Sequence, residues 1–312
     1  MTKTNVHTLD LYFRGKPELI ASYLIPHQNG AVLIESGPGS TAKSLQAAVE
    51  AHGLRLENIT DLLLTHIHLD HAGAAGWLAR HGARVHVHPV GAPHLRNPER
   101  LLASAGRIYG DQMDALWGEF LPVPAEQLVT HSDGEVFQIE ELRFTALDTP
   151  GHATHHFAYL LEDICFTGDI GGVRLPGIGH VRLPMPPPEF HLERWRQSLA
   201  RLRQLDLSAI APTHFGIFSD PQQHLDMLED ALNEIEAWID AEMPADPPME
   251  ALQTRLTQWA KTFALSHGLS ESQWQAYEIV NPIGMSAAGI YRYWHKIRRN
   301  TTGRTQTSRR LA

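Results

Sequence analysis

The sequence predicts an α+β fold in which two β-sheets pack together with helices outside, a four-layer αβ/βα sandwich with a C-terminal helical extension. Apolar runs of strand length alternate with helical patterns in two successive series, and only helical patterns follow Asp220. The 312 residues, 43% of them hydrophobic, can fill one large core and a smaller one. We therefore expect a first domain at 1–219, a helical domain at 220–299 and a disordered basic tail at 300–312.

Each strand series consists of short apolar runs bounded by turn residues. The expected strands are 19–25, 31–35, 61–65 and 84–88 in the first series, with helices at 41–51 and 72–81, and 136–139, 142–148, 157–161 and 164–167 in the second. Two such series favour two packed sheets over a single doubly wound sheet.

A stretch rich in glycine and proline, residues 168–188, follows the second series. It is too long and irregular for a plain connection, and long loops in compact domains are usually functional. We expect it to be a substrate loop. A helix at 191–205 and an apolar stretch at 208–212 then complete the first domain.

The C-terminal region carries helical signals in order. Pro221 suits a first helical position, Ser270 and Gln273 have the spacing of a capping box, and a last helix is expected at 286–298. Apolar stripes at helical spacing run through Leu225, Leu228, Leu232, Ile235 and Ile239, and through Leu252, Leu256, Trp259 and Phe263. Such amphipathic helices could also pair two subunits in a homodimer.

Charge is distributed unevenly along the chain. The net charge is −9, yet seven Lys or Arg and no acidic residue follow Glu278. Residues 1–278 therefore carry 19 basic and 35 acidic residues, a balance of −16. Such a body repels polyanions, so a small-molecule substrate is expected and nucleic acid is not.

The chain shows no sign of export or of a membrane anchor. It has no apolar run of bilayer length, and the residues after Met1 lack the apolar core of a secretory signal. A single cysteine, Cys165, excludes an internal disulfide framework and a thiolate-rich metal site. We expect a cytoplasmic protein that holds any metal through histidine and carboxylate.

The run Thr65-His66-Ile67-His68-Leu69-Asp70-His71 places four metal-ligating side chains within six positions, directly after an apolar strand. In an extended segment alternate side chains point the same way, so His66 and His68 can share one ion while Asp70 and His71 turn toward a second. The small residues that follow allow a helix to begin against the site. This spacing predicts a metal-dependent hydrolase.

The run resembles the hallmark H-x-H-x-D-H of the metallo-β-lactamase superfamily, and the resemblance covers roughly residues 6–220. Further motifs of that family match in order: Thr149-Pro150-Gly151-His152, Phe166-Thr167-Gly168-Asp169 and Pro212-Thr213-His214. The resemblance implies that His152 completes the first ion's ligands, that Asp169 bridges, and that His214 joins Asp70 and His71 on the second ion. It also implies that Asp61 supports the ligands without touching the metal.

The same resemblance implies two divalent ions, zinc above all, with manganese or iron also compatible with such ligands. Two ions can lower the pKa of a bound water to about 7, so a metal-bound hydroxide would be the nucleophile. Asp70 would orient that water or accept its proton. A small ester, thioester or lactone is the expected substrate.

Other chemistries remain open. Phosphodiester or RNA hydrolysis needs a basic groove, and persulfide oxidation by one iron ion uses a subset of these ligands. A true β-lactamase is disfavoured because those relatives lack the bridging aspartate that Asp169 supplies. The helical end and the segment 91–110 resemble a glyoxalase II-like branch, which leaves the substrate unassigned.

Several further residues have competing interpretations. We interpret Glu35-Ser36-Gly37-Pro38 as a tight turn, although relatives often carry Asp-Thr-Gly there. His155 and His156 either reach the cleft or cap a turn. Tyr109, Tyr159 and Tyr291 are candidate acids for the leaving group.

Overall fold

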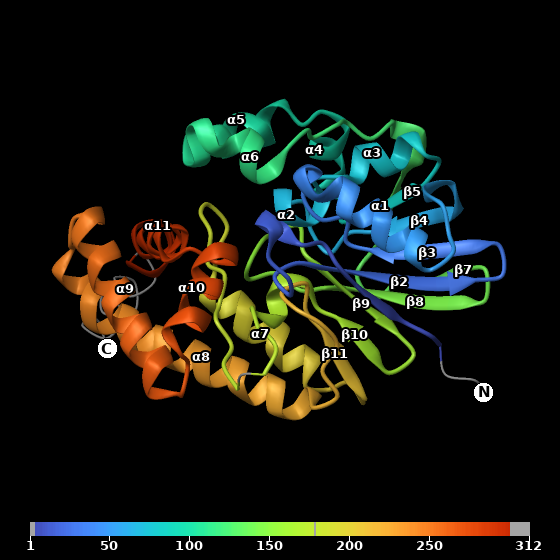
Figure 1. The fold of residues 1–312 in the computed structure, drawn as a ribbon. Coiled ribbons are helices and arrows are strands. Elements are labelled where there is room, and N and C mark those ends of the chain that lie inside the picture. The colour runs from blue at the N-terminus through green and yellow to red at the C-terminus, as the bar shows by residue number, and fades with distance from the viewer. Residues whose placement is uncertain (1–3, 178, 300–312) are drawn as a thin grey trace, which may run out of the picture.

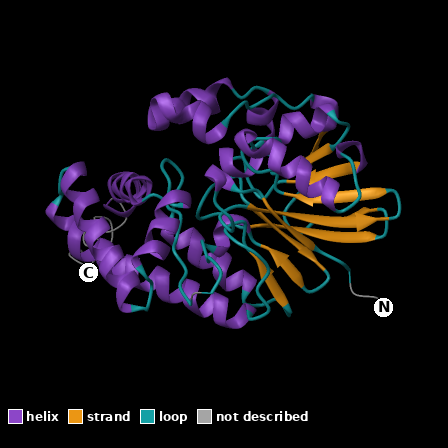
Figure 2. Ribbon diagram, in the orientation of Figure 1, coloured by secondary structure: helices purple, strands orange, loops and turns teal. Residues whose placement is uncertain are grey.

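The computed structural model describes residues 4–177 and 179–299. Two sheets are stacked against each other, helices cover their outer sides, and further helices extend from one end of the stack (Figures 1 and 2). The predicted four-layer sandwich with a helical extension is confirmed. The predicted tail, 300–312, lies outside the described residues.

The first sheet has six strands in chain order, antiparallel from β1 to β3 and parallel from β3 to β6. They are β1 (His7–Asp10), β2 (Ala21–His27), β3 (Gly30–Ile34), β4 (Ile59–Leu63), β5 (Arg84–Val87) and β6 (Leu128–Thr130). Helices α1 (Ala42–Ala51) and α3 (Ala75–Arg80) lie in its crossovers. Strands β3 and β4 are buried almost throughout, and apart from Thr60 and Asp61 in β4 their side chains are apolar.

The second sheet has five strands in the order β11-β10-β9-β8-β7. They are β7 (Val136–Ile139), β8 (Leu142–Asp148), β9 (Phe157–Leu161), β10 (Ile164–Phe166) and β11 (Ala209–Ala211). Neighbours are antiparallel except β10 and β11, which are parallel and joined through α7 (Leu192–Leu202). The ends of β4, β8, β10 and β11 thus open toward one region.

The C-terminal helices are α8 (Pro221–Glu242), α9 (Met249–Ser266), α10 (Glu271–Val280) and α11 (Ile283–Tyr293), followed by a π-helical turn at Trp294–Arg298. The predicted capping box is present, since Ser270 and Gln273 bond each other's backbone. The last helix begins earlier than predicted, at Ile283, with Pro282 as its N-cap. The apolar core continues from the sandwich into these helices.

Some elements escaped the sequence prediction. Edge strands β1 and β6 are short and only partly buried, and α4 (Ala92–Arg96), α5 (Glu99–Tyr109) and α6 (Met113–Trp117) bury few side chains. The helix predicted at 72–81 is interrupted at Gly73. A side chain there would lie only 2.6 Å from the Pro38 backbone, so this close approach needs glycine.

Among the described residues, no helix combines the length and the apolar character that crossing a membrane requires.

Candidate metal centre

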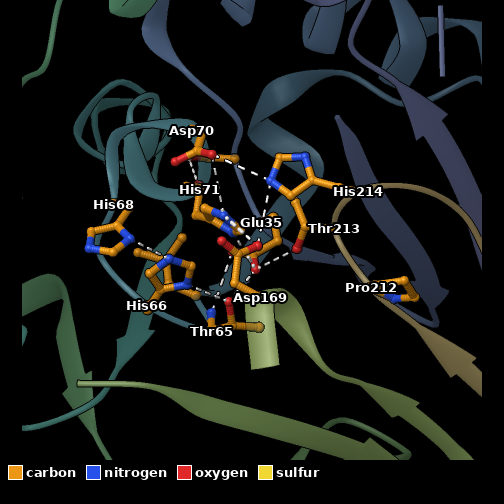
Figure 3. A network of polar contacts seen from close by, with 12 residues as sticks. Glu35, Thr65, His66, His68, Asp70, His71, Asp169, Pro212, Thr213 and His214 are labelled. Carbon is orange, nitrogen blue, oxygen red and sulfur yellow. Dashed lines mark hydrogen bonds and ion pairs between the residues drawn. The ribbon is translucent and has the colours of Figure 1, made fainter. Parts of the chain in front are cut away.

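The candidate metal-binding run lies where β4 leaves its sheet (Figure 3). His66 is fully buried, and the backbone then turns into α2 (Leu69–Ala72), with His68 at its N-cap. The sequence prediction treated the whole run as extended. In the structure Asp70 and His71 instead lie on a helical turn, and that turn is what directs them away from the first two histidines.

Three histidines form what we call the first ligand set: His66, His68 and His152, which follows β8. His152 Nε2 lies 2.8 Å from His68 Nδ1 and 3.2 Å from His66 Nε2, and these last two atoms are 2.9 Å apart. All three nitrogens thus surround one point, as the ligands of a single cation do.

The first ligand set is neutral in the metal-free protein. Burial lowers the pKa of His66, His68 and His152, in the case of His68 to about 3. Neutral imidazole is the form that binds metal. His152 Nδ1 donates to the Pro184 carbonyl at 2.8 Å, which directs the Nε2 lone pair into the set.

Asp70, His71 and His214 form the second ligand set. Asp70 Oδ2 lies 3.6 Å from His71 Nε2 and 3.4 Å from His214 Nε2. His214 follows β11 and is oriented by its Nδ1, which donates to the Leu19 carbonyl at 2.9 Å. Three potential ligand atoms therefore surround a second point.

The second ligand set carries charge. Burial opposes protonation of His71 and His214, but nearby carboxylates, with Asp70 and Asp169 foremost, outweigh it and raise both pKa values. Burial would likewise raise the pKa of Asp70, yet the two imidazoles lower it to about 2. The protons on His71 and His214 therefore occupy the positions at which a cation would bind.

Asp169 lies between the two sets. Its Oδ1 is 3.3 Å from His71 Nε2 and 3.5 Å from His214 Nε2, whereas Oδ2 is 3.3 Å from His152 Nε2. The tight turn after β10 presents this carboxylate. Gly168 makes the turn possible because it has φ +50° and a side chain there would collide with Thr65.

The buried polar atoms fit a metal centre. Among the described residues, His71 Nε2 and Asp169 Oδ1 are buried without a hydrogen-bond partner, although they lie at ion-pair distance. Leaving such atoms unsatisfied costs about 1–3 kcal/mol each. A cation between the sets would satisfy both, and imidazole with carboxylate suits zinc, manganese or iron.

Glu35 belongs to the site although the sequence interpretation gave it only a turn. It is fully buried, and its Oε1 accepts from His71 Nδ1 at 3.1 Å and from the hydroxyls of Thr65 and Thr213. It therefore fixes the ring orientation of His71 and raises its basicity. The signal was its position, where relatives carry aspartate, but the longer side chain obscured it.

Asp61, expected to support the ligands, has other partners among the described residues. Its carboxylate accepts from His86 Nε2 at 2.8 Å and from Arg84 at 2.9 Å, and none of its described hydrogen bonds involves a candidate ligand. Asp61 lies in the middle of β4 and its partners Arg84 and His86 lie on β5, so its carboxylate joins these two neighbouring strands.

The two histidines after His152 both lie close to it. His156 is fully buried beside the Thr149 hydroxyl at 2.9 Å and supports the turn. His155 packs its ring edge-on against His68, 5.6 Å between centroids, and its Nε2 lies 3.1 Å from Glu189. His155 therefore borders the first ligand set.

The structure separates the three candidate tyrosines. Tyr159 is fully buried and donates to the Leu64 carbonyl at 3.2 Å, so it is committed to the core. Tyr291 packs on His295, on α11 and its π-helical continuation. Burial, followed by the Asp70 charge, raises the pKa of Tyr109, so its hydroxyl feels the charge of the second ligand set.

Comparisons with known proteins agree with this geometry. The family model described as "Metallo-beta-lactamase superfamily" matches residues 15–214. A metallo-beta-lactamase fold-containing protein from Sulfurisphaera tokodaii is 26% identical over 215 residues, which cover 67% of this chain and 78% of that protein. The crystal structure of an archaeal superfamily protein from Sulfolobus tokodaii aligns with a TM-score of 0.63 at 19% identity, covering 92% of this chain and 98% of that one. That structural likeness shows the fold.

Two further relatives carry names of hydrolases. An atrochrysone carboxyl ACP thioesterase from Aspergillus fumigatus is 30% identical over 206 residues, 65% of this chain and 52% of the relative. This chain thus spans about half the length of that enzyme. A hydroxyacylglutathione hydrolase from Haemophilus influenzae is 30% identical over 186 residues, 59% of this chain and 80% of the relative.

Proposed function

Because the chain belongs to the metallo-β-lactamase superfamily, and is thus a hydrolase of that family, we propose that it is a two-metal hydrolase acting on a thioester. The position of Asp169 carries the two-metal part of this proposal. One carboxylate oxygen faces each ligand set, an arrangement that suits a ligand shared between two cations. A one-ion site built on the first set would leave Asp70 and His214 without a role.

The names of two relatives support the thioester part. Both an acyl carrier protein thioesterase and a hydroxyacylglutathione hydrolase cleave a carbon–sulfur bond next to a carbonyl. The buried Cys165 cannot act as an alternative nucleophile, because burial raises the pKa of its thiol to about 12. The chemistry is therefore assigned to the two ligand sets and to a water.

The ligand sets define how this chain would perform the reaction. Zinc or a similar pair of ions would polarise the substrate carbonyl and lower the pKa of a water to about 7. Asp70, whose side chain is 19% exposed, lies on the accessible side and can orient that water or take its proton. The Glu35 carboxylate and the Pro184 carbonyl orient His71 and His152 by accepting hydrogen bonds from their Nδ1 atoms.

The test combines metal analysis with a substrate panel. Full-length protein would be stripped of metal, reloaded with zinc, and assayed on an acyl carrier protein thioester, a glutathione thioester, a lactone and a phosphodiester. We expect two ions per chain and turnover highest on a thioester. Turnover confined to the phosphodiester, or unchanged after stripping, would overturn the proposal.

A further inference from the structure

The glycine- and proline-rich segment folds back on itself as a two-armed loop, residues 173–184, which the structure describes except for residue 178. Its arms are joined by reciprocal backbone hydrogen bonds between Val173 and Arg182, at 2.8 and 3.0 Å. The side chains of Val173, Arg182 and Leu183 are buried. The arms of the segment are therefore packed into the protein.

Each arm of the loop ends at one candidate ligand. In the first arm, the Arg174 amide donates to the His214 carbonyl at 2.6 Å, and the Phe215 amide donates back to Arg174 at 3.0 Å. In the second arm, the Pro184 carbonyl accepts from His152 Nδ1 at 2.8 Å. His152 and His214 belong to different ligand sets, so one loop holds a member of each.

A single side chain from the C-terminal helices ties the two arms together. The hydroxyl of Tyr277, on α10, donates to the His180 carbonyl at 2.8 Å and accepts from the Leu175 amide at 3.2 Å. Leu175 lies in the first arm and His180 in the second. Tyr277 is fully buried, so water cannot replace these bonds without rearrangement.

The neighbours of Tyr277 hold the second arm from the same helix. Arg182 donates to Glu278 Oε1 at 2.6 Å and to the Asn281 carbonyl at 3.3 Å, and its guanidinium lies 4.1 Å above the Trp274 ring. These contacts fix where the arm that ends at Pro184 lies. The C-terminal helices therefore reach the candidate metal centre through the loop.

We propose, on the basis of the two-metal function above, that Tyr277 is a positioning residue that fixes the separation of His152 and His214. The physical reason is preorganisation. Two ligands on an irregular loop bind an ion tightly only if their backbone is already held, and groups behind the ligands typically change metal affinity by about 10- to 100-fold. Tyr277 supplies this support to both sets at once.

The decisive variant is Tyr277→Phe, which removes the hydroxyl and keeps the ring against Arg182. Tyr291→Phe, on the adjacent helix α11, is the matched control because it removes a hydroxyl from a ring that packs on His295. Metal-free full-length proteins would be titrated with Co²⁺ against a chromophoric chelator. The visible spectrum of bound cobalt reports ligand geometry, which a purely structural role would leave unchanged.

We expect Tyr277→Phe to weaken both binding steps by about 10-fold and to alter the cobalt spectrum, with Tyr291→Phe matching wild type. Dissociation constants within twofold of the control at both steps would overturn the proposal. If Tyr277→Phe also lowers the melting temperature of the metal-free protein, the variant Glu278→Gln serves as the second test of the positioning role. That variant loosens only the second arm, so it should weaken the step assigned to His152, and unchanged binding would contradict the role of the loop.

This experiment separates the positioning role from the proposed function. Wild-type protein that binds fewer than two cobalt ions refutes the two-metal hydrolase, whatever Tyr277 does. Wild-type protein that binds two ions with an unaffected Tyr277→Phe variant refutes the positioning role alone.

Discussion

The two ligand sets share a carboxylate but differ in charge before any cation binds. His66, His68 and His152 are neutral, since burial lowers their pKa values. His71 and His214 have raised pKa values because carboxylates surround them. The difference arises mainly from the carboxylates of Asp70 and Asp169, which lie close to His71 and His214, and Glu35 behind His71 adds to it. It teaches that similar buried histidines become different metal ligands through the carboxylates that surround them.

The largest expected effect comes from the residue that joins the sets. Asp169→Ala should reduce the occupancy of both ions together and lower turnover by more than the roughly 10- to 100-fold typical of a lost supporting bond. Equilibrium dialysis with elemental analysis measures this. Two tightly held ions in the variant would contradict a bridging role.

Removing a ligand of one set should cost the protein one ion and leave the other bound. His68→Ala should abolish hydrolysis and empty the first set, while the second set keeps its ion. The protein should stay folded because the His68 side chain is only partly buried at the mouth of the site. Circular dichroism checks that the variant stays folded, and zinc stoichiometry counts its bound ions. Unaltered turnover would show that His68 is not a ligand.

A substitution behind the second set tests the origin of the difference. Glu35→Gln keeps the shape but removes the charge that raises the basicity of His71, so zinc should bind about 10- to 100-fold more weakly at the second set only. Glu140→Gln, an exposed glutamate distant in the sequence from these ligands, is the matched control. Equal weakening at both sets would show that Glu35 supports the whole centre and not His71 alone.

The smallest expected effect is a difference in pH dependence. Below their raised pKa values His71 and His214 keep protons that a cation must displace, whereas the first set stays neutral, in the case of His68 down to about pH 3. Lowering the pH should therefore weaken cation binding at the second ligand set more than at the first, by about tenfold per pH unit for each proton displaced. Calorimetry in buffers of different ionisation enthalpy counts those protons. Equal proton release on cation binding at the two ligand sets would contradict this difference in their protonation.

Strand and helix patterns predicted the sandwich, and the resemblance to the superfamily implied that seven side chains would converge. The sequence missed Glu35 because its partners come from two segments distant from it in the sequence, Thr65 and His71 in one and Thr213 in the other. It gave Asp61 a supporting role at the site, whereas the described partners of Asp61 are His86 and Arg84 on the neighbouring strand β5. These errors share a cause, since hydrogen bonds behind a ligand depend on three-dimensional neighbours and leave little periodic signal.

The loop 173–184 is a second region whose contacts the sequence could not predict. Its glycines and prolines correctly indicated an irregular segment. Composition could not show that its arms would be buried, nor that Tyr277, roughly 100 residues further along the chain, would tie them together. Apolar spacing predicted the C-terminal helices themselves, but not the contact through which they reach the site.

The most direct test is a titration of metal-free, full-length protein with Zn²⁺, following bound ions and thioester hydrolysis in the same samples. Two ligand sets joined by Asp169 predict two ions per chain and full activity only when both have bound. Saturation at one ion per chain with full activity would contradict a two-metal centre.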